Sequence, residues 1–128
     1  MSNFRKQLDK AYDKKVVGGL EDKTRSTALI AVTELVNNTP VDTGRARGNW
    51  NLDINAVNES IDSPEDESGF VTITKAEASL TGLKIDDTAY ISNHLPYIER
   101  LNDGHSQQSP AGFVEAALQV TNRKAREL

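Results

Sequence analysis

Apolar residues recur every three or four positions along the first third of the chain, and polar residues fill the positions between them. This spacing predicts a helix from about Leu20 to Asn38, because it collects the apolar side chains on one helical face. That face is formed by Ala28, Leu29, Val32, Leu35 and Val36. Pro40 lacks a backbone N–H and disfavours helical geometry in the residue before it, so we expect the helix to end at Asn38.

A narrower apolar stripe precedes this helix and predicts a second, shorter one. The stripe consists of Phe4, Leu8, Ala11 and Tyr12. The dipeptide Gly18-Gly19 follows, and because each glycine costs roughly 1 kcal/mol relative to alanine inside a helix, we expect a break or a kink there. Residues 1–19 are therefore predicted to form an N-terminal arm, which either frays or reaches a neighbouring molecule.

After the long helix, the pattern changes from helical spacing to the alternation of a strand. Asp42 can accept a backbone N–H two residues later and Gly44 tolerates a positive φ, so a tight turn is predicted at this point. Beyond the turn, Trp50, Leu52 and Ile54 alternate with polar residues. This period is typical of a strand with one buried face and one face toward solvent.

The middle of the chain predicts a loop, a short helix and a second strand. Residues 58–69 contain five carboxylates, a proline and several serines, a composition that predicts a solvated acidic loop. Residues 73–83 have helical spacing, and Thr74 with Glu77 forms a capping box at their start. Residues 88–93 are rich in β-branched and aromatic side chains, which predicts a strand antiparallel to the first one.

The C-terminal part predicts a helical turn and a final helix. Pro96 suits the first position of the turn, and Gly104 suits its end. Ser109 and Pro110 then provide a cap and a first helical residue for a last helix, which carries its positive charges near its C-terminus. We therefore expect a single α+β domain over residues 1–128, with a long N-terminal helix and a C-terminal helix packed on a small antiparallel sheet.

Composition narrows the classes of function. The length of 128 residues predicts one domain with a modest core. The residues of the chain are 37% hydrophobic and 5% aromatic, which is low, so we expect a partner to bury further apolar surface. The formal net charge of -4 argues against a general nucleic-acid binder, which needs a surplus of cations. The absence of cysteine excludes disulfides and thiolate metal sites. With no membrane-spanning apolar run and a charged start that is not a secretory signal, we expect synthesis in the cytoplasm.

Catalytic chemistry has little support in the sequence. Histidine is a common general acid and base, and His94 and His105 lie close in the sequence to Glu99 and Asp103, so they could have these roles. The structural alternative is that His94 caps the turn at Pro96 and that His105 sits in a loop. No HExxH or GxSxG motif occurs, and the acidic loop lacks the residue order of a calcium site. We expect no catalytic residue, no metal and no cofactor.

Two arginines stand between the predicted turn and the first strand. Arg45 and Arg47, beside Gly44 and Gly48, could suggest a phosphate site, but there is no Walker lysine and the glycine spacing matches no dinucleotide fingerprint. Their spacing instead places both guanidinium groups on the same face at the start of a strand. A guanidinium binds a carboxylate bidentately, so we expect these arginines to pair either across a subunit interface or within the chain.

Two segments together resemble a known family. The first, TPVDTGRARGNW, joins a helix to a strand, and the second, ISNHLPYIERLNDGHSQQSPAGFVEAAL, contains a proline-tyrosine turn and a Gly-His-Ser loop before a final helix. The residues that carry the resemblance are Thr39, Pro40, Val41, Asp42, Thr43, Gly44, Arg45, Asn93, Pro96, Tyr97, Gly104, His105, Ser106, Gln108, Pro110 and Gly112. In this order they resemble the neck and tail-completion proteins of tailed bacteriophages, the small head-tail joining proteins related to minor tail protein Z. The resemblance covers about residues 28–120.

This resemblance implies a structural virion protein without enzymatic activity, located at the head-tail junction. It implies a ring of copies, with six as the expected number, in contact with other neck and tail proteins such as the head connector or stopper and the tail terminator or tail tube. Genomic DNA would pass through the lumen without specific binding, and no membrane is involved. Arg45, Arg47, Tyr97 and His105 are the interface candidates in this interpretation, and Trp50 belongs to the core.

Two alternatives stay open at this point. The first is a tail terminator, a ring protein that caps the tail tube and has a similar fold in outline. The second belongs to another class: a small cytoplasmic hydrolase that uses His94 and His105, or a regulator directed at the host.

Overall fold

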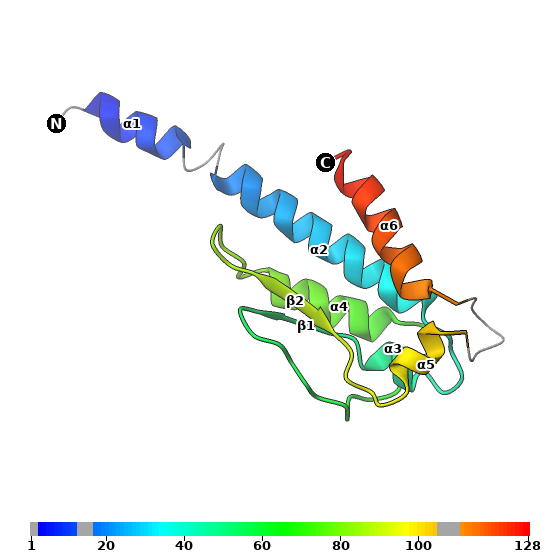
Figure 1. The fold of residues 1–128 in the computed structure, drawn as a ribbon. Helices are drawn as coiled ribbons and strands as arrows, with labels where there is room; N and C mark the ends of the chain where they lie inside the picture. The colour runs from blue at the N-terminus through cyan, green and yellow to red at the C-terminus, as the bar shows by residue number, and fades with distance from the viewer. Residues whose placement is uncertain (1–2, 13–16, 105–110) are drawn as a thin grey trace.

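The computed structural model describes residues 3–12, 17–104 and 111–128, which form the α+β fold that the sequence predicts (Figure 1). The elements in chain order are α1 (Asn3–Tyr12), α2 (Gly18–Asn38), α3 (Arg45–Gly48), β1 (Asn51–Ile54), α4 (Phe70–Leu80), β2 (Ala89–Ser92), α5 (Ile98–Asn102) and α6 (Phe113–Ala125). The expected long helix, the C-terminal helix and the small antiparallel sheet are thus all present. No helix within the described ranges is long and apolar enough to cross a membrane.

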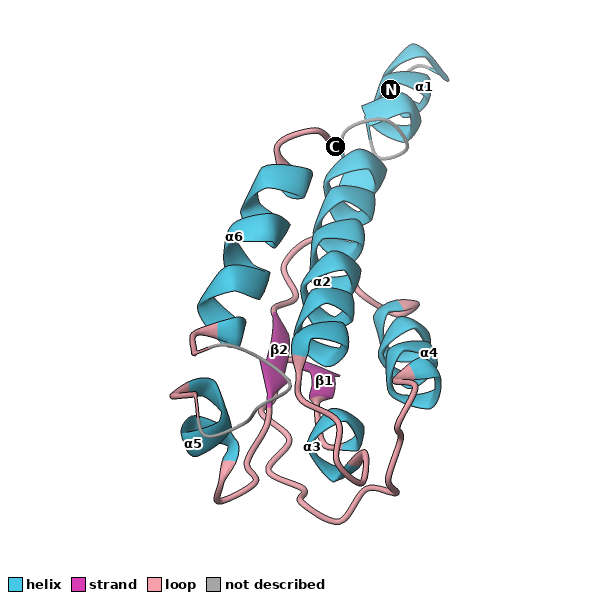
Figure 2. Cartoon of the chain, turned by 90° about the vertical axis from the view of Figure 1, so that its right-hand side faces the viewer, coloured by secondary structure: helices cyan, strands magenta, loops and turns pink. Residues whose placement is uncertain are grey.

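Helix α2 is the central element of the body. It packs against α6 on one side and α4 on the other, and the sheet lies next to α4 (Figure 2). The short helices α3 and α5 lie together at the end of the body that is farthest from α1 (Figures 1 and 2). This arrangement brings the segments after α2 and after β2 to the same end of the molecule.

The core confirms the apolar face that was predicted for α2. Val32 and Val36 are completely buried, Ala28 and Leu35 are buried, and Leu29 packs against them from the edge. The other members of the cluster come from the strand region, α4, the segment after it and α6: Trp50, Leu52, Ala76, Leu80, Leu83, Phe113 and Ala117. One continuous apolar cluster therefore joins both long helices to α4 and the sheet, as expected when each element buries a single face.

The two strands pair in the predicted antiparallel direction, with Leu52 opposite Ile91 and Asn51 opposite Ser92. The expectation that the polar residues of β1 face solvent is wrong for Asn51, which is only 4% exposed. Its side-chain amide donates to the backbone carbonyls of Asn58 and Ser60 at 3.4 and 3.1 Å. The loop after β1 therefore covers the second face of the sheet at this end, and a hydrogen bond offsets the burial of the amide.

Three helix boundaries differ from the predicted ones. Helix α4 begins at Phe70 rather than near residue 73, and α2 begins at Gly18, so that both glycines belong to its first turn. The expectation of a helix break at Gly18-Gly19 is therefore wrong, because both glycines are helical, and residues 13–16 lie outside the described part. Helix α6 begins at Phe113, three residues beyond the expected proline start, and the predicted cap at residues 109–110 also lies outside the described part.

Asn102, at the end of α5, organises the start of α6. Its side-chain oxygen accepts a hydrogen bond from the Val114 N–H at 2.9 Å, and its amide donates to the Glu115 carboxylate at 3.0 Å. Its backbone carbonyl accepts from the N–H of Gly112, whose φ of 82° lies in the left-handed region. In many helices a residue next to the first turn caps these backbone N–H groups. In α6 this role belongs to Asn102, which lies on another helix.

Candidate assembly interface

The two segments that carry the family resemblance meet at the α3–α5 end of the body. The Asn93 side-chain amide donates to the Ala46 carbonyl at 3.0 Å across 47 residues of sequence. Beside this bond, the Arg45 guanidinium lies over the Tyr97 ring, 5.7 Å from its centroid, in the geometry of a cation–π contact. The structure therefore brings together two of the four interface candidates, Arg45 and Tyr97.

A buried polar pair connects the end of α2 to the start of β1. Thr39 has no exposed surface, and its hydroxyl donates to the Leu35 carbonyl while accepting from the Trp50 indole N–H at 2.8 Å. Each group thus has a partner, so burying it carries no penalty for an unmade hydrogen bond. Trp50 lies in the core, as predicted, and Thr39 fixes its orientation.

Arg45 and Arg47 do not share a face at the start of a strand, and that expectation is wrong. Both belong to α3, where residues two positions apart point in different directions. Arg45 is exposed, whereas the Arg47 guanidinium donates to the backbone carbonyls of Thr39, Glu67 and Asn37 at 2.9, 2.8 and 3.1 Å. The within-chain alternative therefore describes Arg47, although its partners are carbonyls rather than a carboxylate.

The predicted turn is present, but its hydrogen bond differs from the expected one. The Thr43 hydroxyl oxygen accepts from the Arg45 N–H at 3.2 Å, and Asp42 is exposed. Gly44 has the expected positive φ, 85°. A second constraint acts on this glycine, because a Cβ atom there would lie 2.6 Å from the backbone nitrogen of Glu67. Only glycine fits both the conformation and the close approach.

The acidic loop is packed against this turn, which corrects the expectation of a solvated segment. The Asp66 N–H donates to the Gly44 carbonyl at 2.9 Å, and the backbone of Gly48 leaves no room for a side chain beside Pro64. Ser63 N–H donates to the buried Asn49 side chain at 3.1 Å. Most carboxylates of the loop are exposed, but its backbone is hydrogen-bonded to the turn before α3 and to Asn49 after it.

Asp66 is the buried carboxylate of the loop and the cap of α4. Its two oxygens accept from the backbone N–H groups of Gly69 and Thr72 at 3.1 and 2.8 Å, and from the Thr72 hydroxyl at 2.8 Å. The predicted capping box at Thr74 is therefore wrong, because α4 begins earlier. Burial alone would raise the pKa of Asp66, but the hydrogen bonds from Thr72, Gly69 and Ser68 outweigh it and lower the pKa below its ordinary value of 3.8.

The lowered pKa of Asp66 predicts a loss of stability in acid. A carboxyl whose pKa is lower in the folded state stabilises the fold fully above its unfolded-state pKa, near 3.8. This contribution is lost as the pH falls from there through the folded-state value. Asp66→Asn is expected to lower the free energy of unfolding at pH 7 by about 1–3 kcal/mol, because the amide replaces one acceptor with a donor.

Urea denaturation of Asp66→Asn and wild type between pH 7 and pH 2.5 measures this difference. The gap between the two proteins should narrow as the pH falls below about 4, since Asp66 then becomes protonated in the unfolded wild-type chain while the folded chain still holds it ionised. Asp62→Asn is the matched control, because Asp62 is exposed in the same loop. A constant gap over the whole pH range would contradict the assignment of Asp66.

Within the part of the chain that the structure describes, the catalytic alternative gains no converging set of groups. A cavity of about 270 Å³ beside α5 is lined by Glu99, Asp103 and Asn93, but His94 is exposed and does not line it. The cap role expected for His94 belongs to Asn93, whose side-chain oxygen accepts from the Leu95 N–H at 3.2 Å. The interface candidate His105 lies outside the described residues, and within them no three His, Asp or Glu side chains could hold a metal.

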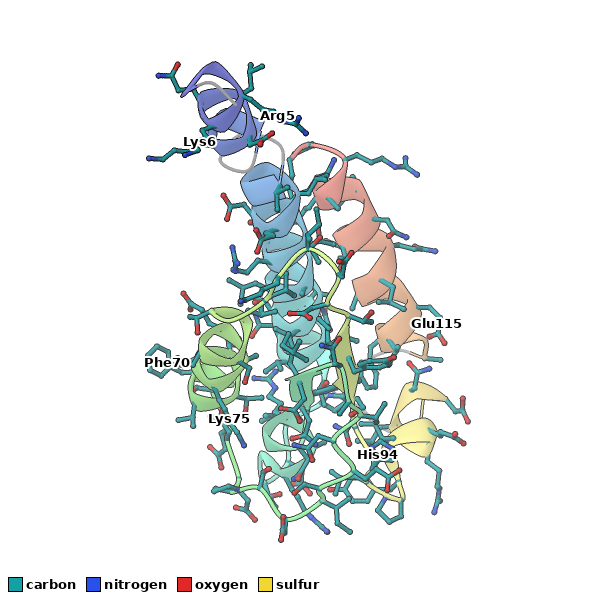
Figure 3. The ribbon with its side chains drawn as sticks, turned by 90° about the vertical axis from the view of Figure 1, so that its left-hand side faces the viewer. Arg5, Lys6, Phe70, Lys75, His94 and Glu115 are labelled. Carbon is teal, nitrogen blue, oxygen red and sulfur yellow. The ribbon has the colours of Figure 1, made fainter. Side chains whose placement is uncertain are left out.

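The sequence interpretation missed two kinds of residue at this end of the molecule. Asp66 and Asn49 form the polar framework, and their partners lie too far along the chain to be inferred from local spacing. Phe70 and Val71 are 72% and 64% exposed at the start of α4, and Figure 3 shows Phe70 pointing away from the body. The apolar pair FV directly after the loop indicates that a structured element begins there, but it does not indicate that the two side chains are exposed.

Comparison with known proteins adds no family assignment. Scans against protein-family models, curated proteins and solved structures found no match to this chain.

Proposed function

We propose that this chain is a structural virion protein of a tailed bacteriophage, which forms a ring at the head-tail junction and joins the tail to the DNA-filled head. The observation that carries the proposal is the meeting of the two motif segments in one unit, through the Asn93 bond to Ala46 and the Arg45 contact with Tyr97. Motif residues with no local reason to be near each other thus form one surface.

The division of roles within the motif also supports an assembly protein. Thr39, Arg47 and Trp50 hydrogen-bond inside the chain and hold the segment in place. Arg45 is left at the surface on a rigid support, with Tyr97 beneath it. Arginine and tyrosine on a fixed scaffold are the residue types that dominate protein–protein interfaces.

The proposed partners are further copies of the chain, with six as the expected number, and the neighbouring neck and tail proteins. A ring of this kind joins two different surfaces of each protomer. The exposed pair Phe70 and Val71 at the start of α4 offers one apolar surface. In this proposal the net charge of -4 lets genomic DNA pass through the lumen without adhering to it. Synthesis takes place in the host cytoplasm and the final location is the virion.

Reversing the charge at Arg45 tests the proposed interface. Arg45→Glu is expected to weaken ring assembly by at least about tenfold. A tenfold change in affinity corresponds to about 1.4 kcal/mol, and the loss of an arginine that anchors an interface costs about 2 kcal/mol or more. The melting temperature should change little, since Arg45 is exposed and its guanidinium contact with the described part of the chain is with the Tyr97 ring. Sedimentation velocity and electron microscopy measure assembly, and circular dichroism measures the fold.

The control is Arg123→Glu, which makes the same charge change at an exposed site near the end of α6. Normal rings and infectious particles with Arg45→Glu would overturn the assignment of Arg45. Absence of the protein from purified virions would overturn the proposed function itself. Antibody labelling of particles then separates a neck position next to the head connector from the alternative, a terminator at the top of the tail tube.

A further inference from the structure

Among the described residues, helix α1 contributes no side chain to the apolar core. All described side chains from Arg5 to Lys10 are exposed, and Leu8, which belongs to the apolar stripe of this helix, is 54% exposed. In Figures 1 and 3, α1 extends beyond the body at the end where α2 begins. A helix of 10 residues is marginal in water by itself, because few hydrogen bonds offset the cost of nucleation. Its stability therefore calls for a surface that covers the apolar stripe.

A groove of suitable character lies between the first half of α2 and strand β2. Its volume is about 530 Å³, and small or aliphatic side chains line most of it. These include Thr24, Thr27, Ala28, Ala31, Ala89 and Ile91. The Thr27 hydroxyl donates to the Lys23 carbonyl at 2.8 Å, so its polar group is already satisfied within α2. A helix that buries apolar side chains there displaces water from a largely apolar surface, and the Thr27 hydroxyl keeps its hydrogen bond.

The dimensions of the two parts agree. At a rise of about 1.5 Å per residue, α1 is roughly 15 Å long, and the groove follows α2 for about 10 Å from Thr24 to Ala31. Small residues along one helix allow a second helix to approach it closely. The centre of α1, at Leu8, then corresponds to the centre of the groove, at Thr27.

Charge favours the same pairing. Helix α1 contains Arg5, Lys6, Lys10 and Asp9, which give it a formal charge of +2. Because the whole chain has a net charge of -4, the remainder of the chain has a charge of -6. Asp87 lines the groove, and the exposed Asp86 precedes it in the sequence. Lys23 is the cation that lines the groove. A basic helix thus meets a body of opposite net charge, which favours association and its rate.

We infer that α1 of one copy lies in the α2–β2 groove of the next copy and links successive subunits. This inference rests on the proposed ring, because a heterologous contact of arm and groove repeats from subunit to subunit until the ring closes. It names the arm-to-groove contact as a second interface, separate from the Arg45–Tyr97 surface. The occupant is a second copy of this chain, and folding of the arm onto its own groove is the competing outcome.

Cysteine cross-linking tests the contact directly, because the chain contains no cysteine of its own. One protein carries Leu8→Cys, a second carries Thr27→Cys, and the two are mixed and oxidised. A mixed covalent dimer is expected, in clear excess over mixtures in which Leu118→Cys replaces Thr27→Cys. Leu118 is a matched control because it is 45% exposed on α6 and does not line the groove. A yield no higher than that control would overturn the inference.

A protein carrying both Leu8→Cys and Thr27→Cys separates the two occupants. Covalent dimers and larger species support exchange between copies, whereas a cross-linked monomer at high dilution overturns it in favour of the chain's own arm. Leu8→Asp is expected to weaken self-association by at least about tenfold, because burial of one leucine side chain contributes that much or more. Leu118→Asp should leave association unchanged, and an equal loss from both variants would also overturn the inference.

Electron microscopy of the same samples distinguishes this inference from the proposed function. Rings without the Leu8–Thr27 cross-link would leave the ring proposal intact and overturn the arm contact. Cross-linked dimers that never form rings, even with virion partners, would support the arm contact and count against the proposed function.

Discussion

Gly44→Ala is expected to lower the free energy of unfolding by about 3 kcal/mol or more. Alanine pays roughly 1–2 kcal/mol for the left-handed conformation, because Gly44 has a φ of 85°. Its Cβ would also lie 2.6 to 2.8 Å from backbone atoms of Asp66 and Glu67, so the loop would have to move at a further cost of about 1–3 kcal/mol. Urea denaturation followed by circular dichroism measures the loss.

Gly19→Ala is the matched control for this substitution. Gly19 lies in the first turn of α2, has no atom within 4 Å of an added Cβ, and has no positive φ. Alanine there should stabilise the chain by up to about 1 kcal/mol, since it restricts the unfolded backbone and favours the helix. Equal effects of the two substitutions would show that the loop does not pack on Gly44 as described.

Arg47→Ala is the second large effect, with an expected loss of about 3 kcal/mol. The guanidinium satisfies three backbone carbonyls from the end of α2 and from the acidic loop. Hydrogen bonds from a charged donor contribute about 1.5–3 kcal/mol each, but they are not additive when one side chain makes all three. Arg47→Lys should recover only a small part of the loss, because an ammonium cannot reproduce the planar fork.

The neighbouring arginine provides the control for Arg47. Arg45→Ala is expected to change the stability little, because that side chain is exposed and lies over the Tyr97 ring without a buried hydrogen bond to the described residues. The two arginines should then have opposite phenotypes: a loss of stability for Arg47, and a loss of assembly with an intact fold for Arg45. A stable Arg47→Ala protein that fails to assemble would instead restore Arg47 as an interface residue.

The positions of the large elements could be predicted because their signals are local. Pro40 ends α2 near the predicted residue, and the alternation of Trp50, Leu52 and Ile54 predicts the side of β1 that faces the core. The starts of α4 and α6 could not be predicted in the same way. Their capping groups, Asp66 and Asn102, act on backbone donors several residues away, and competing local caps are present in the sequence.

The candidate interface was predictable only as a set of residue types. Its motif indicated that Arg45, Arg47 and Tyr97 belong together, but a strand register was assumed for residues that form a helix. In a strand the two arginines share a face, whereas in α3 one points to solvent and the other reaches the α2 terminus. The exposure of Phe70 likewise depends on how α4 packs against the body, which local sequence does not specify.

The sequence by itself determined the α+β class, the C-terminal end of α2, the antiparallel pairing of two short strands and the need for glycine at position 44. These features follow from spacing, proline and glycine chemistry within a few residues. Only the tertiary structure decided that the acidic loop packs on the turn, that Arg47 supports the fold while Arg45 remains exposed, and that α1 stands apart from a groove. Such outcomes depend on contacts between distant segments, which local patterns do not encode.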